Sequence, residues 1–123
     1  MNVLAVDDSR TIRDLVALTL SREGIDTVLA EDGQLGIEAL HGLHDPPDAI
    51  LADINMPNLD GFGFIRAVRK EDRYAGVPIL VLTTETAREL RMKAREAGAT
   101  GWLVKPFDPA RLVGALRAVT GSR

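Results

Sequence analysis

Short apolar segments alternate with longer segments of helical period along the chain. Five short segments are apolar at successive positions or rich in β-forming residues, which favours strands. These segments are Asn2–Val6, Thr27–Ala30, Ala49–Ala52, Pro78–Leu82 and Gly101–Val104. The segments between and after them carry apolar residues at helical spacing. The predicted helices are Ser9–Glu23, Gln34–Leu43, Phe62–Lys70, Ala87–Ala97 and a last one that starts at Asp108-Pro109. The pattern therefore predicts five strand–helix units.

Local signals mark where these helices begin and end. Ser9 can cap the first helix, and Gly24 can adopt the left-handed conformation just after it. Its predicted apolar face holds Ile12, Leu15, Val16 and Leu20. Strands that are apolar at every position are typical of parallel sheets covered on both faces by crossover helices. With right-handed crossovers, the units predict an α/β domain with an open, doubly wound parallel sheet.

Composition narrows the function classes. The chain has 123 residues, no cysteine, two histidines (His41 and His44) and a formal net charge of −3. The length favours a single domain. The absence of cysteine excludes disulfides, thiolate zinc sites and cysteine nucleophiles. Whole-domain nucleic-acid binders are usually basic, and no apolar run approaches the roughly 20 residues of a membrane helix. We therefore expect a cytoplasmic protein that binds neither nucleic acid nor membrane.

Polar side chains follow four of the five predicted strands. Asp7 and Asp8 follow the first, Asp53 the third, Thr83 the fourth and Lys105 the fifth. In a doubly wound sheet these positions share one edge, which is where ligands bind. Clustered carboxylates without histidine or cysteine favour Mg²⁺, with Mn²⁺ as a second choice. A lysine and a threonine beside such a metal suit a phosphoryl group.

With these residues in place, the chain resembles the response-regulator receiver domains of two-component signalling. The resemblance covers essentially the whole chain and is strongest to the stand-alone chemotaxis (CheY-like) type. Its ordered motifs are Asp7-Asp8, Asp53-Ile54-Asn55-Met56-Pro57, Asp60-Gly61, Thr83 and Lys105-Pro106-Phe107. The resemblance implies a flavodoxin-like fold with strand order 2-1-3-4-5. It also implies a single receiver domain over residues 1–123 with no output domain.

The resemblance assigns the central roles to the acidic cluster. Asp53 would be the nucleophile that takes a phosphoryl group from a phosphohistidine of a sensor kinase (CheA-like). Asp8, Asp53 and the backbone carbonyl of Asn55 would bind Mg²⁺, while Asp7 would act mainly through water. Such a protein is a signalling phosphoacceptor rather than an enzyme with an external substrate.

Further roles follow from the same resemblance. Lys105 would contact Asp53 and then the phosphoryl oxygens, and Thr83 would bond the phosphoryl group. The Lys105–Pro106 peptide would be cis. Asn55 and Glu85 would flank the attacking water and set the lifetime of the phosphorylated state.

Output would come through a surface of the domain. Trp102 matches the switch aromatic and would move inward when Thr83 is drawn toward the phosphoryl group. Arg88, Arg91 and Arg95 form a basic stripe on the fourth predicted helix, beside Trp102. We expect this partner face to bind an acidic peptide of a flagellar motor switch protein (FliM-like) or another target, with the protein acting as a monomer.

Other functions stay open at the level of sequence. A single-domain receiver could serve a non-motor pathway or drain phosphate from a shared kinase. A flavodoxin-type cofactor domain would need a phosphate cradle where Asp7 and Asp8 stand. An aspartate-based phosphohydrolase usually has an Asp-x-Asp pair and a cap segment, which the sequence lacks.

Overall fold

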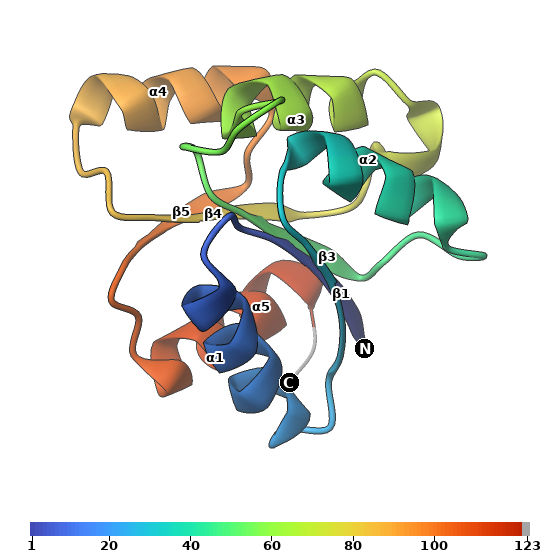
Figure 1. The fold of residues 1–123 in the computed structure, drawn as a ribbon, viewed down its shortest axis with the longest axis vertical. Coiled ribbons are helices and arrows are strands. Elements are labelled where there is room, and N and C mark those ends of the chain that lie inside the picture. The colour runs from blue at the N-terminus through green and yellow to red at the C-terminus, as the bar shows by residue number, and fades with distance from the viewer. Residues whose placement is uncertain (122–123) are drawn as a thin grey trace.

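Five parallel strands form one sheet in the order β2-β1-β3-β4-β5 in the computed structural model, which describes residues 1–121 (Figure 1). The strands are β1 (Asn2–Val6), β2 (Asp26–Ala30), β3 (Ala49–Ala52), β4 (Ile79–Thr83) and β5 (Gly101–Val104). The helices are α1 (Arg10–Ser21), α2 (Gly33–Gly42), α3 (Gly61–Arg69), α4 (Arg88–Ala97) and α5 (Pro109–Thr120). A 3₁₀ turn, η1 (Asp72–Tyr74), precedes β4. The predicted doubly wound α/β fold and its strand order are confirmed.

The sheet is covered on both faces. Helices α2, α3 and α4 lie on one side and α1 and α5 on the other (Figure 1). Successive strand residues point to opposite faces. Leu4 and Val6 of β1 therefore join the cluster beneath α2–α4, whereas Val3 and Ala5 join the cluster beneath α1 and α5. Two buried faces explain why the strands are apolar at successive positions.

The predicted helix signals are used in the structure. Ser9 Oγ accepts a hydrogen bond from the Ile12 amide at 3.3 Å, and Asp108 accepts one from the Ala110 amide at 3.2 Å. Gly24 has φ 71°, in the left-handed region. The two hydrogen bonds cap the starts of α1 and α5, and Gly24 lets the chain turn away after α1.

Some details differ from the expectation. Leu15, predicted on the apolar face of α1, is 45% exposed, because α1 buries only the narrower stripe around Val16 and Leu20. The fourth strand starts one residue later than predicted and includes Thr83. The unpredicted turn η1 buries Tyr74, whose hydroxyl donates to the Leu40 carbonyl at 3.2 Å.

Within residues 1–121, no helix has the length and apolar character that a bilayer crossing requires.

Candidate functional site

The carboxyl ends of the strands place the predicted polar residues together at one edge of the sheet. Asp7 directly follows β1, Asp53 follows β3, Thr83 ends β4 and Lys105 follows β5. Main-chain hydrogen bonds continue the strand pairing into the site. The Asp53 amide donates to the Val6 carbonyl at 3.0 Å, and the Lys105 amide donates to the Thr83 carbonyl at 2.8 Å. The backbone of the site is therefore as firmly held as the sheet.

A buried lysine joins two of the aspartates. Lys105 Nζ lies 2.6 Å from Asp7 Oδ2 and 2.9 Å from Asp53 Oδ2. The side chains of all three residues are less than 10% exposed. One ammonium thus offsets the repulsion between two buried carboxylates, and it already lies against the oxygen atoms of Asp53.

Burial and charge oppose one another at Asp7 and Lys105. Burial raises the pKa of Asp7 above its ordinary value, and the hydrogen bonds from Lys105 and the Ser9 amide offset this only in part. Burial alone would lower the pKa of Lys105, but the contacts with Asp7 and Asp53 outweigh it and leave this pKa raised. Lys105 is therefore protonated at neutral pH and supplies a fixed positive charge.

The third aspartate completes an acidic cluster. Asp7, Asp8 and Asp53 each offer a carboxylate oxygen, and these oxygens lie within 4.8 Å of one another. Asp8 is exposed, so solvent reaches the cluster on its side. An open cluster of hard oxygen donors fits Mg²⁺, which keeps several water ligands. The donor set therefore fits the cation predicted from the sequence.

The other hydrogen-bond donors to the carboxylates of the two buried aspartates are backbone amides. Asp7 Oδ1 accepts a hydrogen bond from the Ser9 amide at 2.9 Å, and Asp53 Oδ1 accepts one from the Ile54 amide at 2.7 Å. Arg13 Nη1 donates to the Asp7 carbonyl at 2.8 Å. These contacts orient both carboxylates toward Lys105.

A second pair of side chains lies at the entrance. Asn55 Nδ2 donates to Glu85 Oε1 at 2.9 Å and so joins the loop after β3 to the loop after β4. The Glu85 amide donates to Thr83 Oγ1 at 3.3 Å, and Thr83 is fully buried. Asn55 and Glu85, the residues predicted to set the lifetime of the phosphorylated state, therefore form one hydrogen-bonded group with Thr83.

The other predicted residues lie on or near β5. The Lys105–Pro106 peptide bond is cis. Trp102 is half-buried and packs against the α2–α4 core cluster, while its indole Nε1 is buried and has no hydrogen-bond partner among the described residues. Val81 of β4 is its strand neighbour. The indole thus lies between the sheet and the surface.

Pattern and spacing alone did not reveal several residues that shape the site. Arg13 is not among the predicted site residues. Its position on the helix that follows Asp7 and Asp8 is a signal that could have identified it. Gly61 was named only as part of the Asp60-Gly61 motif, without a role; it backs the site directly, since a Cβ atom there would lie 2.7 Å from Ile54 Cα and against the Asp53 carbonyl. Asp32 accepts a hydrogen bond from Asn58, which lies in the β3–α3 loop. No local sequence signal marks two residues so far apart as partners.

The fold and the site together define a class of α/β phosphoacceptor domains, with an acidic pocket, a hydroxyl and a lysine at the carboxyl edge of the sheet. Residues 3–117 match the family model described as the response regulator receiver domain. The chain is 36% identical to chemotaxis protein CheY1 of Helicobacter pylori, over 99% of this chain and 98% of that protein.

Solved structures give the same result. CheY4 of Vibrio cholerae superposes with a TM-score of 0.90 at 44% identity, covering 96% of this chain and 97% of that one. The receiver domain of a sensor histidine kinase from Pseudomonas aeruginosa, described with a magnesium ion in its active-site cleft, gives a TM-score of 0.89 at 30% identity over 98% of both chains. The chain belongs to the response regulator receiver family and is of the CheY-like type. Its class is that of a signalling phosphoacceptor in two-component pathways.

Proposed function

We propose that Asp53 is the phosphoacceptor and that its donor is a phosphohistidine of a sensor histidine kinase (CheA-like). A carboxylate oxygen of Asp53 forms a bond to phosphorus as the phosphorus–nitrogen bond to the donor imidazole breaks. The product is an acyl phosphate. The observation that carries this proposal is the bridging position of Lys105 between the buried carboxylates of Asp7 and Asp53, beside the open side at Asp8.

The proposed Mg²⁺ ligands are Asp8, Asp53 and the backbone carbonyl of Asn55, with Asp7 acting mainly through water. Bound Mg²⁺ supplies positive charge for the phosphoryl oxygens. The oxygen cluster supports this assignment, as does the magnesium described in the similar Pseudomonas aeruginosa receiver domain. Mn²⁺ can replace Mg²⁺ at such a site.

The chain's own residues supply the other interactions that phosphoryl transfer needs. Transfer depends on placement and on charge around the phosphoryl oxygens more than on covalent help from protein. Lys105 holds an ammonium 2.9 Å from Asp53, and this ammonium passes to a phosphoryl oxygen. Thr83 donates its hydroxyl to another. Asn55 and Glu85, already hydrogen-bonded to each other, limit the approach of water and set the lifetime of the acyl phosphate.

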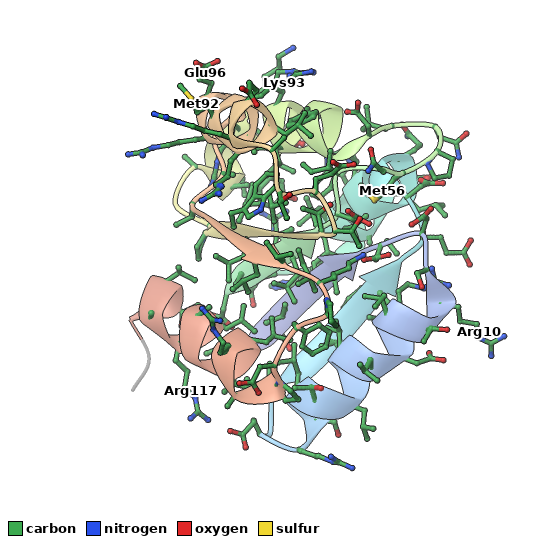
Figure 2. All side chains as sticks on the ribbon, turned by 90° about the vertical axis from the view of Figure 1, so that its left-hand side faces the viewer. Arg10, Met56, Met92, Lys93, Glu96 and Arg117 are labelled. Atoms are coloured by element: carbon green, nitrogen blue, oxygen red, sulfur yellow. The ribbon has the colours of Figure 1, made fainter. Side chains whose placement is uncertain are left out.

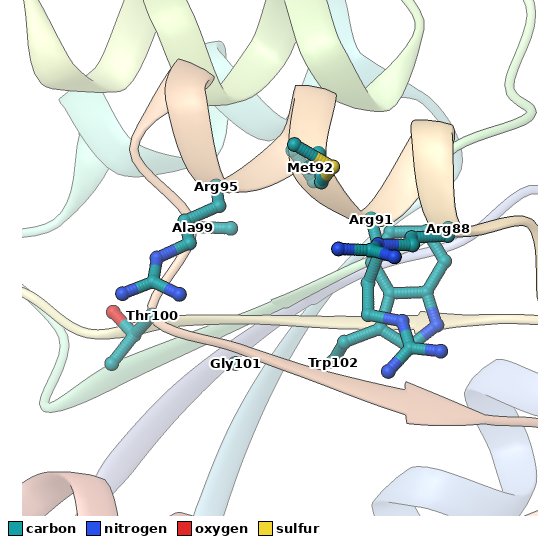
Figure 3. Close-up of a pocket in the computed structure, with 9 residues that line it drawn as sticks. Arg88, Arg91, Met92, Arg95, Ala99, Thr100, Gly101 and Trp102 are labelled. Carbon is teal, nitrogen blue, oxygen red and sulfur yellow. The ribbon is translucent and has the colours of Figure 1, made fainter.

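The output surface in this proposal lies along α4, β5 and α5. Arg88, Arg91 and Arg95 line a cavity of about 820 Å³ between α4 and β5, and Trp102 lies at the end that holds Arg88 and Arg91 (Figure 3). None of these arginines forms an ion pair with any residue in the described range 1–121. Unpaired guanidinium groups on an acidic protein favour a negatively charged partner.

The proposed partner at this surface is an acidic segment of a flagellar motor switch protein (FliM-like). Thr83 and Trp102 are the proposed link between site and surface. When Thr83 turns toward the phosphoryl group, it vacates space that favours an inward Trp102 ring. The CheY relatives support chemotaxis as the pathway.

Mass measurement tests the central step. The protein is incubated with acetyl phosphate and Mg²⁺, and the intact mass is compared with that of Asp53→Asn. We expect one added phosphoryl group on the wild type and none on the variant. An unmodified wild type, or a variant modified to the same extent, would falsify the assignment of Asp53. Trp102, the single tryptophan, reports the switch in the same samples, because its emission should change on modification of the wild type only.

A further inference from the structure

The loop after Asp53 is held by contacts to itself. It runs over residues 54–60 and carries Asn55, whose carbonyl is a proposed Mg²⁺ ligand. The Gly61 amide donates to the Ile54 carbonyl at 2.8 Å, which joins the two ends of the loop. Asn58 has φ 67°, the only positive value among non-glycine residues in the described chain. A residue in this strained region persists only where its surroundings hold it.

The surroundings of Asn58 come from another part of the chain. Asn58 Nδ2 donates to Asp32 Oδ2 at 2.7 Å. The next residues repeat the link, since the Gly33 amide donates to the Leu59 carbonyl at 3.2 Å. A Cβ atom on Gly33 would lie 2.9 Å from Leu59 Cβ, so the two segments are in close contact. Two adjacent hydrogen bonds therefore tie the β3–α3 loop to the start of α2.

Asp32 differs from the other capping aspartates. Its Oδ1 accepts from the Leu35 amide at 2.8 Å and caps α2, while its Oδ2 holds Asn58. Asp60 and Asp108 cap α3 and α5 and have no second hydrogen bond to a distant residue within residues 1–121. Asp32 is also buried, at 6% exposure. One carboxylate thus serves both a helix and a distant loop.

The anchor of this contact is rigid and adjoins the site. Helix α2 is fixed by Leu40, which is fully buried, and by Gly36, where a Cβ atom would lie 2.8 Å from a ring carbon of Phe64. Ala30, two residues before Asp32, accepts a hydrogen bond from the Asp7 amide at 3.1 Å. The contact therefore connects the β2 side of the site to the loop on its β3 side.

We propose that Asp32 and Asn58 form a latch that fixes the loop of residues 54–60 and so positions the Asn55 carbonyl for the metal. They are positioning residues, since neither touches the phosphoacceptor or the cluster. The proposal rests on the proposed function for its link to Mg²⁺, whereas the latch itself is a property of the metal-free protein.

Two variants open the latch with little other change. Asn58→Gly keeps access to positive φ and removes the amide donor. Asp32→Ser keeps a good helix cap but removes the oxygen that reaches Asn58. Asp108→Ser is the matched control, because it makes the same exchange at a cap without a latch.

The first readout is amide hydrogen exchange of the metal-free proteins. Both latch variants should speed exchange in peptides covering residues 54–61 by about tenfold or more, because the loop opens locally more often. The control should leave these peptides unchanged. Unchanged exchange in both latch variants would show that the loop does not depend on the latch.

The second readout is Mg²⁺ affinity by calorimetric titration. Each latch variant should bind Mg²⁺ about tenfold more weakly, in the range seen when supporting hydrogen bonds of a metal site are removed. The double variant should lose no more than either single variant, since both remove one interaction. Faster exchange with wild-type Mg²⁺ affinity would overturn the positioning role. A wild type that binds no Mg²⁺ would contradict the proposed function and the positioning role together, while the exchange result still decides on the latch.

Discussion

At the scale of the residue, the site keeps charges in places that burial makes unfavourable. Asp7 is nearly buried, and its raised pKa means that its ionised form costs folding free energy despite Lys105. The proposed role of Asp7 beside the cation would account for a charge that does not favour stability. Lys105 differs in sign: burial alone would disfavour its ammonium, but its pKa is raised because the contacts with two carboxylates outweigh burial.

The variant Asp7→Asn tests whether the Asp7 carboxylate lowers folding stability while it supports Mg²⁺ binding. A carboxyl group whose pKa is raised on folding destabilises the protein once the pH exceeds the unfolded value of 3.8. The variant should therefore be more stable than the wild type at pH 7. This advantage should shrink as the pH falls and should vanish below 3.8, where Asp7 is protonated in both the folded and the unfolded protein. Urea unfolding at several pH values measures it.

The same variant should lose function in return. With one carboxylate fewer in the cluster, its Mg²⁺ affinity should fall by about tenfold or more. Equal or lower stability at pH 7 would contradict the unfavourable burial of Asp7.

At the scale of the element, close packing between a helix start and the end of β3 defines the position of Asp53, the proposed phosphoacceptor. Helix α3 begins at Gly61 directly against the backbone of Asp53 and Ile54. The hydrogen bond from the Gly61 amide to Ile54 requires this approach. A glycine at this point is therefore a packing requirement of the site, whereas Gly114 on α5 has open space around it.

Gly61→Ala and Gly114→Ala should shift stability in opposite directions. The Gly61 variant should lose about 1–3 kcal/mol, because the added methyl group forces α3 away from Asp53. The Gly114 variant should gain up to about 1 kcal/mol from higher helix propensity. Urea denaturation of both proteins compares them, and a neutral Gly61→Ala would mean that α3 can shift without cost.

At the scale of the whole molecule, charge is distributed unevenly. The formal net charge is −3, yet α4 presents toward the cavity beside Trp102 three arginines that have no ion pair within residues 1–121. Met92 lines the same cavity, whereas Figure 2 shows Lys93 and Glu96 at the outer side of the helix. The acidic cluster and the α4 arginines thus lie on different parts of the molecule, so the proposed cation site and the proposed partner surface do not share residues.

Reversal of two arginines tests the surface. Arg91→Glu/Arg95→Glu should weaken binding to the acidic motor switch segment by about tenfold or more, with the loss smaller at high salt. Phosphorylation by acetyl phosphate should stay unchanged. Arg22→Glu/Arg66→Glu carries the same change of net charge, at the residue after α1 and on α3, and should bind normally. Equal binding by both double variants, measured by fluorescence anisotropy, would remove α4 from the partner surface.

The sequence by itself determined what depends on local or periodic signals. The continuous apolar strands, the caps at Ser9 and Asp108 and the glycine at Gly24 predicted five strand–helix units. Because the carboxyl ends of parallel strands lie at one edge of the sheet, the same pattern predicted that Asp7, Asp53 and Lys105 lie close together. Periodicity does not show how wide a buried stripe is, and for this reason it assigns Leu15 to the apolar face of the first helix although Leu15 is 45% exposed.

Only the tertiary structure decided which distant groups touch. The two ion pairs of Lys105, the close approach of Gly61 to Asp53 and the Asp32–Asn58 latch all join residues whose distance depends on how whole elements pack. A single contact between distant residues produces no periodic pattern in the sequence, so it cannot be predicted from one. The composition and order of the site are thus written along the sequence, whereas the hydrogen bonds that fix its geometry arise only when α2, α3 and the sheet come together.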